Sequence, residues 1–214
     1  DASQLTVRTN ARKDTENLGH KRVLAIALPI VVSNATVPIL GAVDTGVIGQ
    51  MGGAAPIGGV GIGAIILTSI YWIFGFLRMG TVGLVSQALG QNDRDEMDAL
   101  LSRVLMIGLA SGFMLILLQI PIFALAFMVS PASVEVESMA RDHMVIRVFS
   151  APAMISLYGL TGWLIAQERT RGVLVIQLWM NGLNIGLNFL FVLEFGWGIQ
   201  GVASASLIAE WTGF

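Results

Sequence analysis

The sequence contains no cysteine and few charged residues, which make up 12% of its 214 positions. Without cysteine there are no disulfide bonds and no thiolate metal sites. The two histidines, His20 and His143, are too few for a histidine-based metal centre, so we expect no metal site and no cofactor. A net charge of −2 gives no electrostatic reason to expect nucleic acid as a partner.

The chain contains long stretches without charged residues, unlike the sequence of a soluble domain. Residues 23–43 and 45–77 carry no charged side chain, whereas a soluble domain is about 25% charged. A helix needs about 20 apolar residues to cross a bilayer. Charge-free runs separated by turn residues predict six such spans, at about 23–50, 59–89, 99–129, 144–166, 172–194 and 198–214 and beyond. Because the runs do not alternate in polarity, they are helices rather than barrel strands.

The ends and the positive charges suggest how the chain lies in the membrane. Residues 1–20 are polar, so we expect a cytoplasmic tail followed by a six-helix transmembrane lobe over 21–214. Cytoplasmic segments carry an excess of Lys and Arg. Nine of these residues lie on the same side of the expected membrane as the N-terminus, and only Arg141 and Arg147 lie on the opposite side. Since the chain stops at Phe214 within an apolar run, we expect a piece of a longer protein, cut in its sixth helix.

Asp44 is the one charged residue between Val23 and Leu77. An ionisable residue inside a membrane span is rare and costly, so by default it indicates an ion or substrate path. Pro29 and Pro38 lie in the same span, and proline removes a backbone hydrogen bond and tends to kink a helix. Two interpretations are open, a moving helix that carries the carboxylate or a static bend.

Span five carries a polar stripe. Its members are spaced four, three and four residues apart, so they share one helical face: Gln177, Asn181, Asn184 and Asn188. An unpaired polar group in hydrocarbon costs several kcal/mol, so this face must meet protein or water. The amides either join helices to each other or line a cavity opposite Asp44.

Two further charges lie inside spans. Arg78 is in span two, and Glu210 is in span six, one turn after Ser206. We interpret Arg78 as a structural charge that pairs with a carboxylate such as Glu210. A membrane enzyme would need a nucleophile, an acid pair or a metal cluster at this depth, and one isolated Asp with amides does not supply it. We therefore do not expect an enzyme.

Five segments occur in order along the chain: ALPIVVSNATVPILGAVDTGVIGQMG, FLRMGTVGLVSQALG, SAPA, NGLNIGLNFLFV and GVASASLIAE. Together they resemble the N-terminal half of a multidrug and toxic compound extrusion (MATE) transporter, with a DNA-damage-inducible F (DinF) subgroup as the nearest match. The resemblance implies half of a twelve-helix, two-lobe transporter in a bacterial inner membrane. It also implies export of amphipathic, often cationic compounds in exchange for protons or sodium, by alternating access, and a C-terminal lobe missing from this chain.

The resemblance also implies roles for single residues. The ion-coupling carboxylate of helix one falls on Asp44, and the proline involved in bending falls on Pro29. The polar partners fall on Asn184, Asn188 and Ser206, where the family usually has an acid in place of Asn188. Sodium favours several oxygen ligands and surrounding negative charge, whereas a proton needs one carboxylate. We therefore expect proton coupling, with sodium at Asp44 as the alternative.

Two other functions stay open at this point. One is a lipid-linked oligosaccharide flippase of the same superfold, which should line its cavity with several basic residues, whereas Arg78 is the one available here. The other is a membrane scaffold without transport activity, for which a buried lone acid would be an unexplained cost.

Overall fold

The computed structural model describes residues 2–50, 52–129 and 131–214, and the side chains of residues 2–19, 21, 37 and 38 lie outside that description. Within the described ranges the regular structure is helical and contains no strand, so the predicted all-α class is confirmed. The α-helices are α1 (Ala2–Gly49), α2 (Ala54–Trp72), α3 (Phe76–Gly90), α4 (Arg94–Leu117), α5 (Gln119–Val129), α6 (Val134–Arg147), α7 (Ala151–Ala166), α8 (Thr170–Asn188) and α9 (Gly198–Gly213). Three short elements continue neighbouring helices, η1 (Ile73–Gly75), η2 (Val148–Ser150) and the π-helical η3 (Phe189–Glu194).

Five helical segments are long and apolar enough to cross a membrane, so the protein is a multi-pass membrane protein. They are Arg22–Gly49, Ala54–Gly90, Arg94–Leu117, Val134–Ala166 and Thr170–Glu194. These segments follow the order of the first five expected spans. Helix α9, with 16 residues, occupies the position of the sixth.

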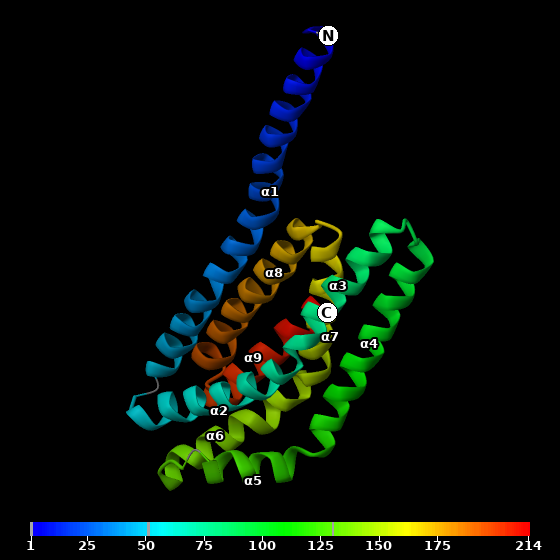
Figure 1. Ribbon diagram of the computed structural model, residues 1–214. Coiled ribbons are helices and arrows are strands. Elements are labelled where there is room, and N and C mark those ends of the chain that lie inside the picture. The colour runs from blue at the N-terminus through cyan, green and yellow to red at the C-terminus, as the bar shows by residue number, and fades with distance from the viewer. Residues whose placement is uncertain (1, 51, 130) are drawn as a thin grey trace.

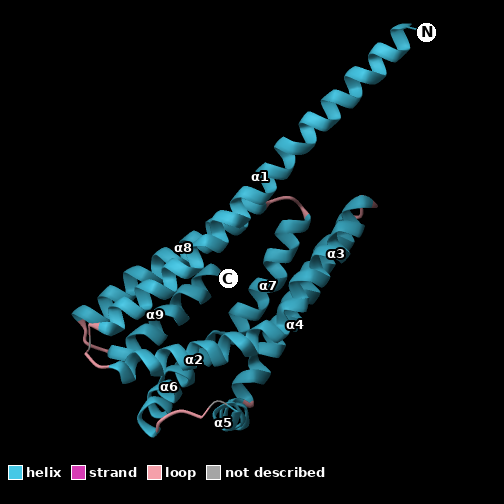
Figure 2. Cartoon of the chain, turned by 60° about the vertical axis from the view of Figure 1, so that its left-hand side comes forward, coloured by secondary structure: helices cyan, strands magenta, loops and turns pink. Residues whose placement is uncertain are grey.

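Two expected boundaries are wrong. The third span, expected over 99–129, is interrupted at Leu118, and α5 then lies across the end of the bundle (Figures 1 and 2). The fourth span begins at Val134 rather than near residue 144. The Ser133 hydroxyl accepts a hydrogen bond from the Val136 N–H, and a serine at this position satisfies an otherwise unpaired donor of the first turn. The charged stretch before residue 144 is therefore helical, which a hydropathy pattern alone does not reveal.

Helix α1 runs along α8 and projects beyond the bundle at its N-terminal end (Figures 1 and 2). It begins at Ala2, so the backbone of the segment expected to be a polar tail is helical. An exposed ion pair joins α1 to the turn before α8. Arg22 Nε and Nη2 donate hydrogen bonds to the Glu168 carboxylate at 2.6–3.1 Å. These hydrogen bonds and the guanidinium charge lower the pKa of Glu168.

Glycine allows α4 and α7 to pack closely. A Cβ at Gly108 would lie 2.6 Å from Ser156 Oγ, and a Cβ at Gly112 would collide with the backbone of Pro152. Small residues permit such approaches between membrane helices. Next to this contact, a cluster that includes Leu67, Met144 and Ile155 fills the space between α2, α6 and α7.

We predict that Gly112→Ala destabilises the protein by about 1–3 kcal/mol, because a methyl group at this contact overpacks the α4–α7 interface. Gly186→Ala on α8 is the matched control, since a Cβ there meets no described atom within 4 Å. Denaturant unfolding in detergent checks both variants. A Gly112→Ala protein as stable as the Gly186→Ala protein would contradict the close packing.

Candidate functional site

The amide stripe of α8 is buried among neighbouring helices. Asn181, Asn184 and Asn188 are 6%, 3% and 0% exposed, and Gln177 is partly buried. The sequence left open whether these amides join helices or line a cavity. The structure shows the first use, because three asparagines bridge helices. Gln177 lines a cavity, but that cavity does not include Asp44, so a cavity opposite Asp44 stays a prediction.

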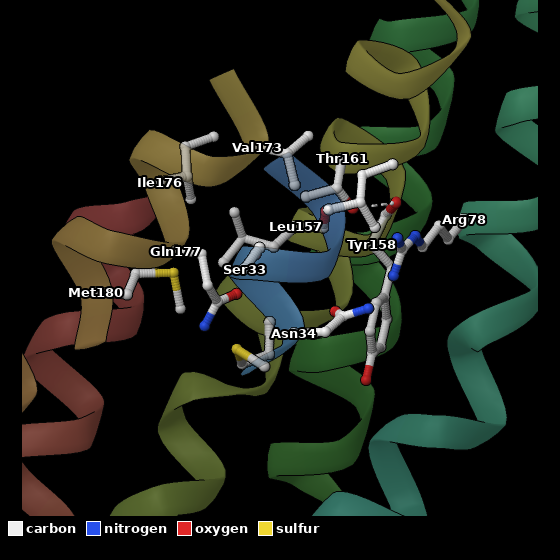
Figure 3. Close-up of a pocket in the computed structure, with 12 residues that line it drawn as sticks. Ser33, Asn34, Arg78, Leu157, Tyr158, Thr161, Val173, Ile176, Gln177 and Met180 are labelled. Carbon is white, nitrogen blue, oxygen red and sulfur yellow. Dashed lines mark hydrogen bonds between the residues drawn. The ribbon is translucent and has the colours of Figure 1, made fainter. Parts of the chain in front are cut away.

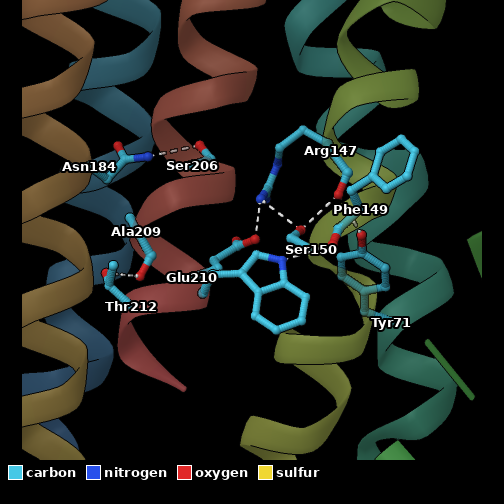
Figure 4. A network of polar contacts seen from close by, with 10 residues as sticks. Tyr71, Arg147, Phe149, Ser150, Asn184, Ser206, Ala209, Glu210 and Thr212 are labelled. Atoms are coloured by element: carbon cyan, nitrogen blue, oxygen red, sulfur yellow. Dashed lines mark hydrogen bonds and ion pairs between the residues drawn. The ribbon is translucent and has the colours of Figure 1, made fainter. Parts of the chain in front are cut away.

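Asp44 of α1 stands at one end of a hydrogen-bonded chain. Asn188 Nδ2 donates to Asp44 Oδ1 at 2.5 Å and to Asn184 Oδ1 at 2.8 Å. Asn184 Nδ2 in turn donates to Ser206 Oγ at 2.8 Å (Figure 4). The four residues that the sequence singled out on three helices therefore form one continuous site across α1, α8 and α9.

The amide of Asn184 also fits its surroundings with its oxygen and nitrogen exchanged. With its oxygen and nitrogen exchanged, Asn184 accepts from the Ser206 N–H at 3.2 Å and from Ser206 Oγ at 2.8 Å, and its nitrogen lies 3.3 Å from Asp44 Oδ1. Asn188 Oδ1 is buried and has no hydrogen-bond partner within the described residues. The site thus holds a spare acceptor beside the carboxylate.

A second contact joins α1 to α8 closer to the cytoplasmic end expected for α1. Gln177 Nε2 donates to Asn181 Oδ1 at 3.0 Å, and Asn181 Nδ2 donates to Thr36 Oγ1 at 2.6 Å. Sequence reasoning missed Thr36. Its signal was weak, because a single hydroxyl in an apolar helix usually bonds to its own backbone, as Thr36 also does to the Ser33 carbonyl.

The two prolines of α1 lie inside an uninterrupted helix that ends at Gly49. Pro29 is partly buried. The side chain of Pro38 lies outside the described part of the structure. Their role in bending stays a prediction.

A buried ion pair lies beside this chain, and its partners differ from those expected. Glu210 pairs with Arg147 of α6 and not with Arg78, and the two side chains are 11% and 14% exposed (Figure 4). Arg147 Nη1 also donates to Ser150 Oγ at 3.3 Å, and Tyr71 donates to the Arg147 carbonyl at 3.1 Å. Arg147 further interacts electrostatically with Asp44. Sequence reasoning had placed Arg147 at a span end, because the early start of α6 was not recognised.

Next to Arg147 on α6, His143 is 2% exposed and packs against Gly63 of α2. Neither of its ring nitrogens has a hydrogen-bond partner in the described ranges. Those ranges also contain no cluster of three or more His, Cys, Asp or Glu side chains that could hold a metal ion.

Arg78 of α3 borders a cavity of about 110 Å³ between α1, α3, α7 and α8 (Figure 3). Its polar lining includes Asn34, Tyr158, Thr161 and Gln177. Asp44 does not line this cavity. The polar chain and the cavity are therefore separate features of one bundle, linked through α1 and α8.

A family model described as MatE matches residues 29–190, which is most of the chain. The chain belongs to the MatE family. This confirms the resemblance on which the assignment of site residues rested. The MatE match covers Asp44, both prolines, Arg78 and the whole amide stripe, and it ends before Ser206 and Glu210.

Individual relatives agree with this MatE assignment. The chain is 37% identical over 191 residues to the DNA damage-inducible protein F of Escherichia coli (strain K12), which covers 89% of the chain and 42% of the relative. It is similar in fold to the structure described as the outward-facing conformation of a multidrug resistance MATE family transporter of the MOP superfamily. That match has a TM-score of 0.82 and 19% identity, and it covers 90% of this chain and 43% of the other. The structure of MATE in the bent conformation matches with a TM-score of 0.82 and 18% identity, over 91% and 43%. The chain therefore spans less than half the length of these proteins.

We predict that Arg147→Met destabilises this MatE lobe by about 3–5 kcal/mol, because it leaves the Glu210 carboxylate buried without its partner. Replacing both partners, as in Arg147→Met with Glu210→Leu, should recover most of that loss. Arg141→Met is the matched control, since its ion pair with Glu137 is exposed and is worth about 1 kcal/mol or less. Unfolding in detergent measures all three, and equal effects of the two single substitutions would refute the buried pair.

Proposed function

We propose that this MatE chain forms the N-terminal lobe of a two-lobe secondary transporter that exports small amphipathic compounds in exchange for protons. The transporter would lie in the inner membrane of a bacterium with its N-terminus in the cytoplasm, and it would catalyse no covalent chemistry. Three findings support the proposal: family membership, the coverage of about 42% of a longer relative, and the five membrane-spanning segments.

The observation that carries the coupling step is the contact of Asp44 with Asn188 inside the buried amide chain. A carboxylate in a membrane span is expensive unless its hydrogen bonds are satisfied. Here the ionised form accepts a charge-assisted hydrogen bond, which is roughly twice as strong as a neutral one. The stability of the α1–α8 contact therefore depends on the charge of Asp44.

Protonation would reverse the role of Asp44 in this contact. A neutral carboxyl group loses the charge-assisted bond and becomes a donor instead. The buried Asn188 Oδ1, which has no described partner, could accept a hydrogen bond from the Asp44 hydroxyl if the Asn188 amide turned. The alternative orientation of Asn184 allows the rest of the chain to follow. Protonation of Asp44 thus weakens the contact between α1 and α8.

Substrate export would follow if the proton and the cationic substrate cannot be bound at the same time. A cationic amphipath is favoured while Asp44 is ionised, and protonation from outside removes that attraction. Pro29 leaves the carbonyl of the preceding turn without a hydrogen-bond donor, so α1 would bend there once its contact with α8 weakens. A structural neighbour described as MATE in the bent conformation is compatible with such a movement.

The donor set favours a proton over sodium. Sodium would need several oxygen ligands, and the chain offers the Asp44 carboxylate with the oxygens of Asn184, Asn188 and Ser206. Asn188 supplies no negative charge to this site, where a second carboxylate would favour sodium. One carboxylate is sufficient for a proton.

The test uses the full-length transporter that contains this chain, in membrane vesicles with an imposed proton gradient. We predict that Asp44→Asn reduces ethidium export and the accompanying proton flux at least about tenfold, with and without sodium. Asp98→Asn, at an exposed position on α4, should behave like the unmodified protein. Proton-coupled export that survives in Asp44→Asn would refute the proposed role of Asp44.

The choice of ion has a test of its own. We predict that Asn188→Asp makes export respond to sodium, because a second carboxylate supplies the negative charge that a sodium site favours. Export by the unmodified protein should be the same in sodium and in choline buffers. A requirement for sodium in the unmodified protein would overturn the inference of proton coupling.

A further inference from the structure

Two hollows in the bundle meet at Arg78. The cavity of about 110 Å³ lies between α1, α3, α7 and α8. A second groove of about 490 Å³ lies against α3 and α7. Three residues line both hollows, Ile30 of α1, Arg78 of α3 and Tyr158 of α7.

The backbone of Arg78 is held in place by α7. A Cβ at Gly162 would lie 2.6 Å from the Arg78 carbonyl oxygen, so the two helices touch at this point. The side chain reaches from α3 into the space beside Tyr158 (Figure 3). Helix α3 ends at Gly90, twelve residues further on, which places Arg78 about 18 Å along the helix from that end. Arg78 therefore lies inside the apolar segment Ala54–Gly90 rather than at its end.

The Arg78 guanidinium is a positive charge inside this apolar segment. Within the described residues it takes part in no ion pair with a carboxylate, in contrast to the buried Arg147. An arginine inside a membrane span ordinarily pairs with another group or faces a water-filled cavity. Its five N–H donors suit the two oxygens of one carboxylate.

The walls of the two hollows suit an anion better than a cation. Among the described side chains, no Asp or Glu lines either hollow. The larger groove is bordered mainly by apolar side chains, among them Trp72, Met79, Val82 and Ile165, and its volume lies in the range of about 300–1,000 Å³ that small-molecule sites occupy. Asp44 is ten residues from Asn34 along α1, about 15 Å away by helical rise, so its charge is not part of these walls.

We propose that the groove at Arg78 binds an amphipathic organic acid. The carboxylate of the ligand forms hydrogen bonds with the Arg78 guanidinium, and its apolar body lies along Trp72, Met79 and Ile165. This assignment deepens the proposed function, on which it rests, by adding a class of exported compound that the Asp44 site would repel. It makes Arg78 a binding residue rather than a structural charge.

The experiment measures binding at equilibrium, without an ion gradient, by the full-length transporter in lipid nanodiscs. The probe is 11-(dansylamino)undecanoic acid, whose fluorescence rises in an apolar site. Its primary amide is the neutral match, with the same chain and no charge. We expect the acid to bind at least about tenfold more tightly than the amide, as a charge-assisted pair with arginine implies.

Variants assign that preference to Arg78. Arg78→Gln should bind the two probes with equal affinity, and Arg78→Lys, which keeps the charge without the planar fork, should retain part of the preference. Trp72→Ala should weaken both probes alike. Arg103→Gln is the matched control, because Arg103 pairs with Glu96 on the exposed side of α4, and it should keep the full preference.

Two results would overturn the proposal. Equal binding of acid and amide by the unmodified protein would mean that Arg78 is already neutralised, for instance by a carboxylate of the second lobe. A preference for the acid that persists in Arg78→Gln would place the anion elsewhere. Amide binding reports whether Arg78→Gln is folded, and Arg78→Lys provides the test if it is not. The binding assay uses no ion gradient. Its outcome is therefore independent of whether export is coupled to protons.

Discussion

The structure depends on the requirement that polar groups inside a membrane find their partners within the protein. Helix α8 brings three buried asparagines into the bundle, and each must be hydrogen-bonded there. Asn181 bonds to α1, Asn184 bonds to α9, and Asn188 joins Asp44 to the same chain. The position of α1 against α8 is therefore set by hydrogen bonds as much as by apolar packing. In hydrocarbon there is little hydrophobic gain from joining two helices, so these bonds and close packing decide which faces meet.

The buried charges follow the same requirement in two different ways. Arg147 and Glu210 neutralise each other across α6 and α9, and Ser150 accepts a further hydrogen bond from the guanidinium. Arg78 borders two hollows and pairs with no carboxylate among the described side chains. One arginine is thus part of the framework, while the other is available to a ligand. The contrast arises from which helix lies opposite each side chain, since the residue type is the same.

Helix α1 runs along α8, and polar contacts spaced along its length join it to the bundle. Arg22 meets Glu168, Thr36 meets Asn181, and Asp44 meets Asn188. Among the side chains of α1 that the structure describes, the buried apolar ones are Val47 and Ile48, which lie near its C-terminal end. Protonation of Asp44 changes one of these contacts, because the charge-assisted hydrogen bond from Asn188 is lost. This contact explains how protonation of Asp44 would lead to a movement of α1.

The sequence by itself determined the membrane class, the order of the spans, the shared face of the α8 amides and the MatE family. These properties are local, because hydropathy, helical spacing and motif order can be read along a single segment.

Only the tertiary structure decided which residues contact one another. Asp44 and Asn188 are 144 residues apart, and Arg147 and Glu210 are 63 apart, so their contacts depend on how distant helices cross. The expected pairing of Arg78 with Glu210 was wrong for that reason, and Thr36 was missed for the same one. The break at Leu118 and the early start of α6 were also invisible to hydropathy, because the first changes direction without changing polarity and the second is a charged helix. Which of several possible partners a buried polar side chain takes is a property of helix packing, and no single stretch of sequence contains it.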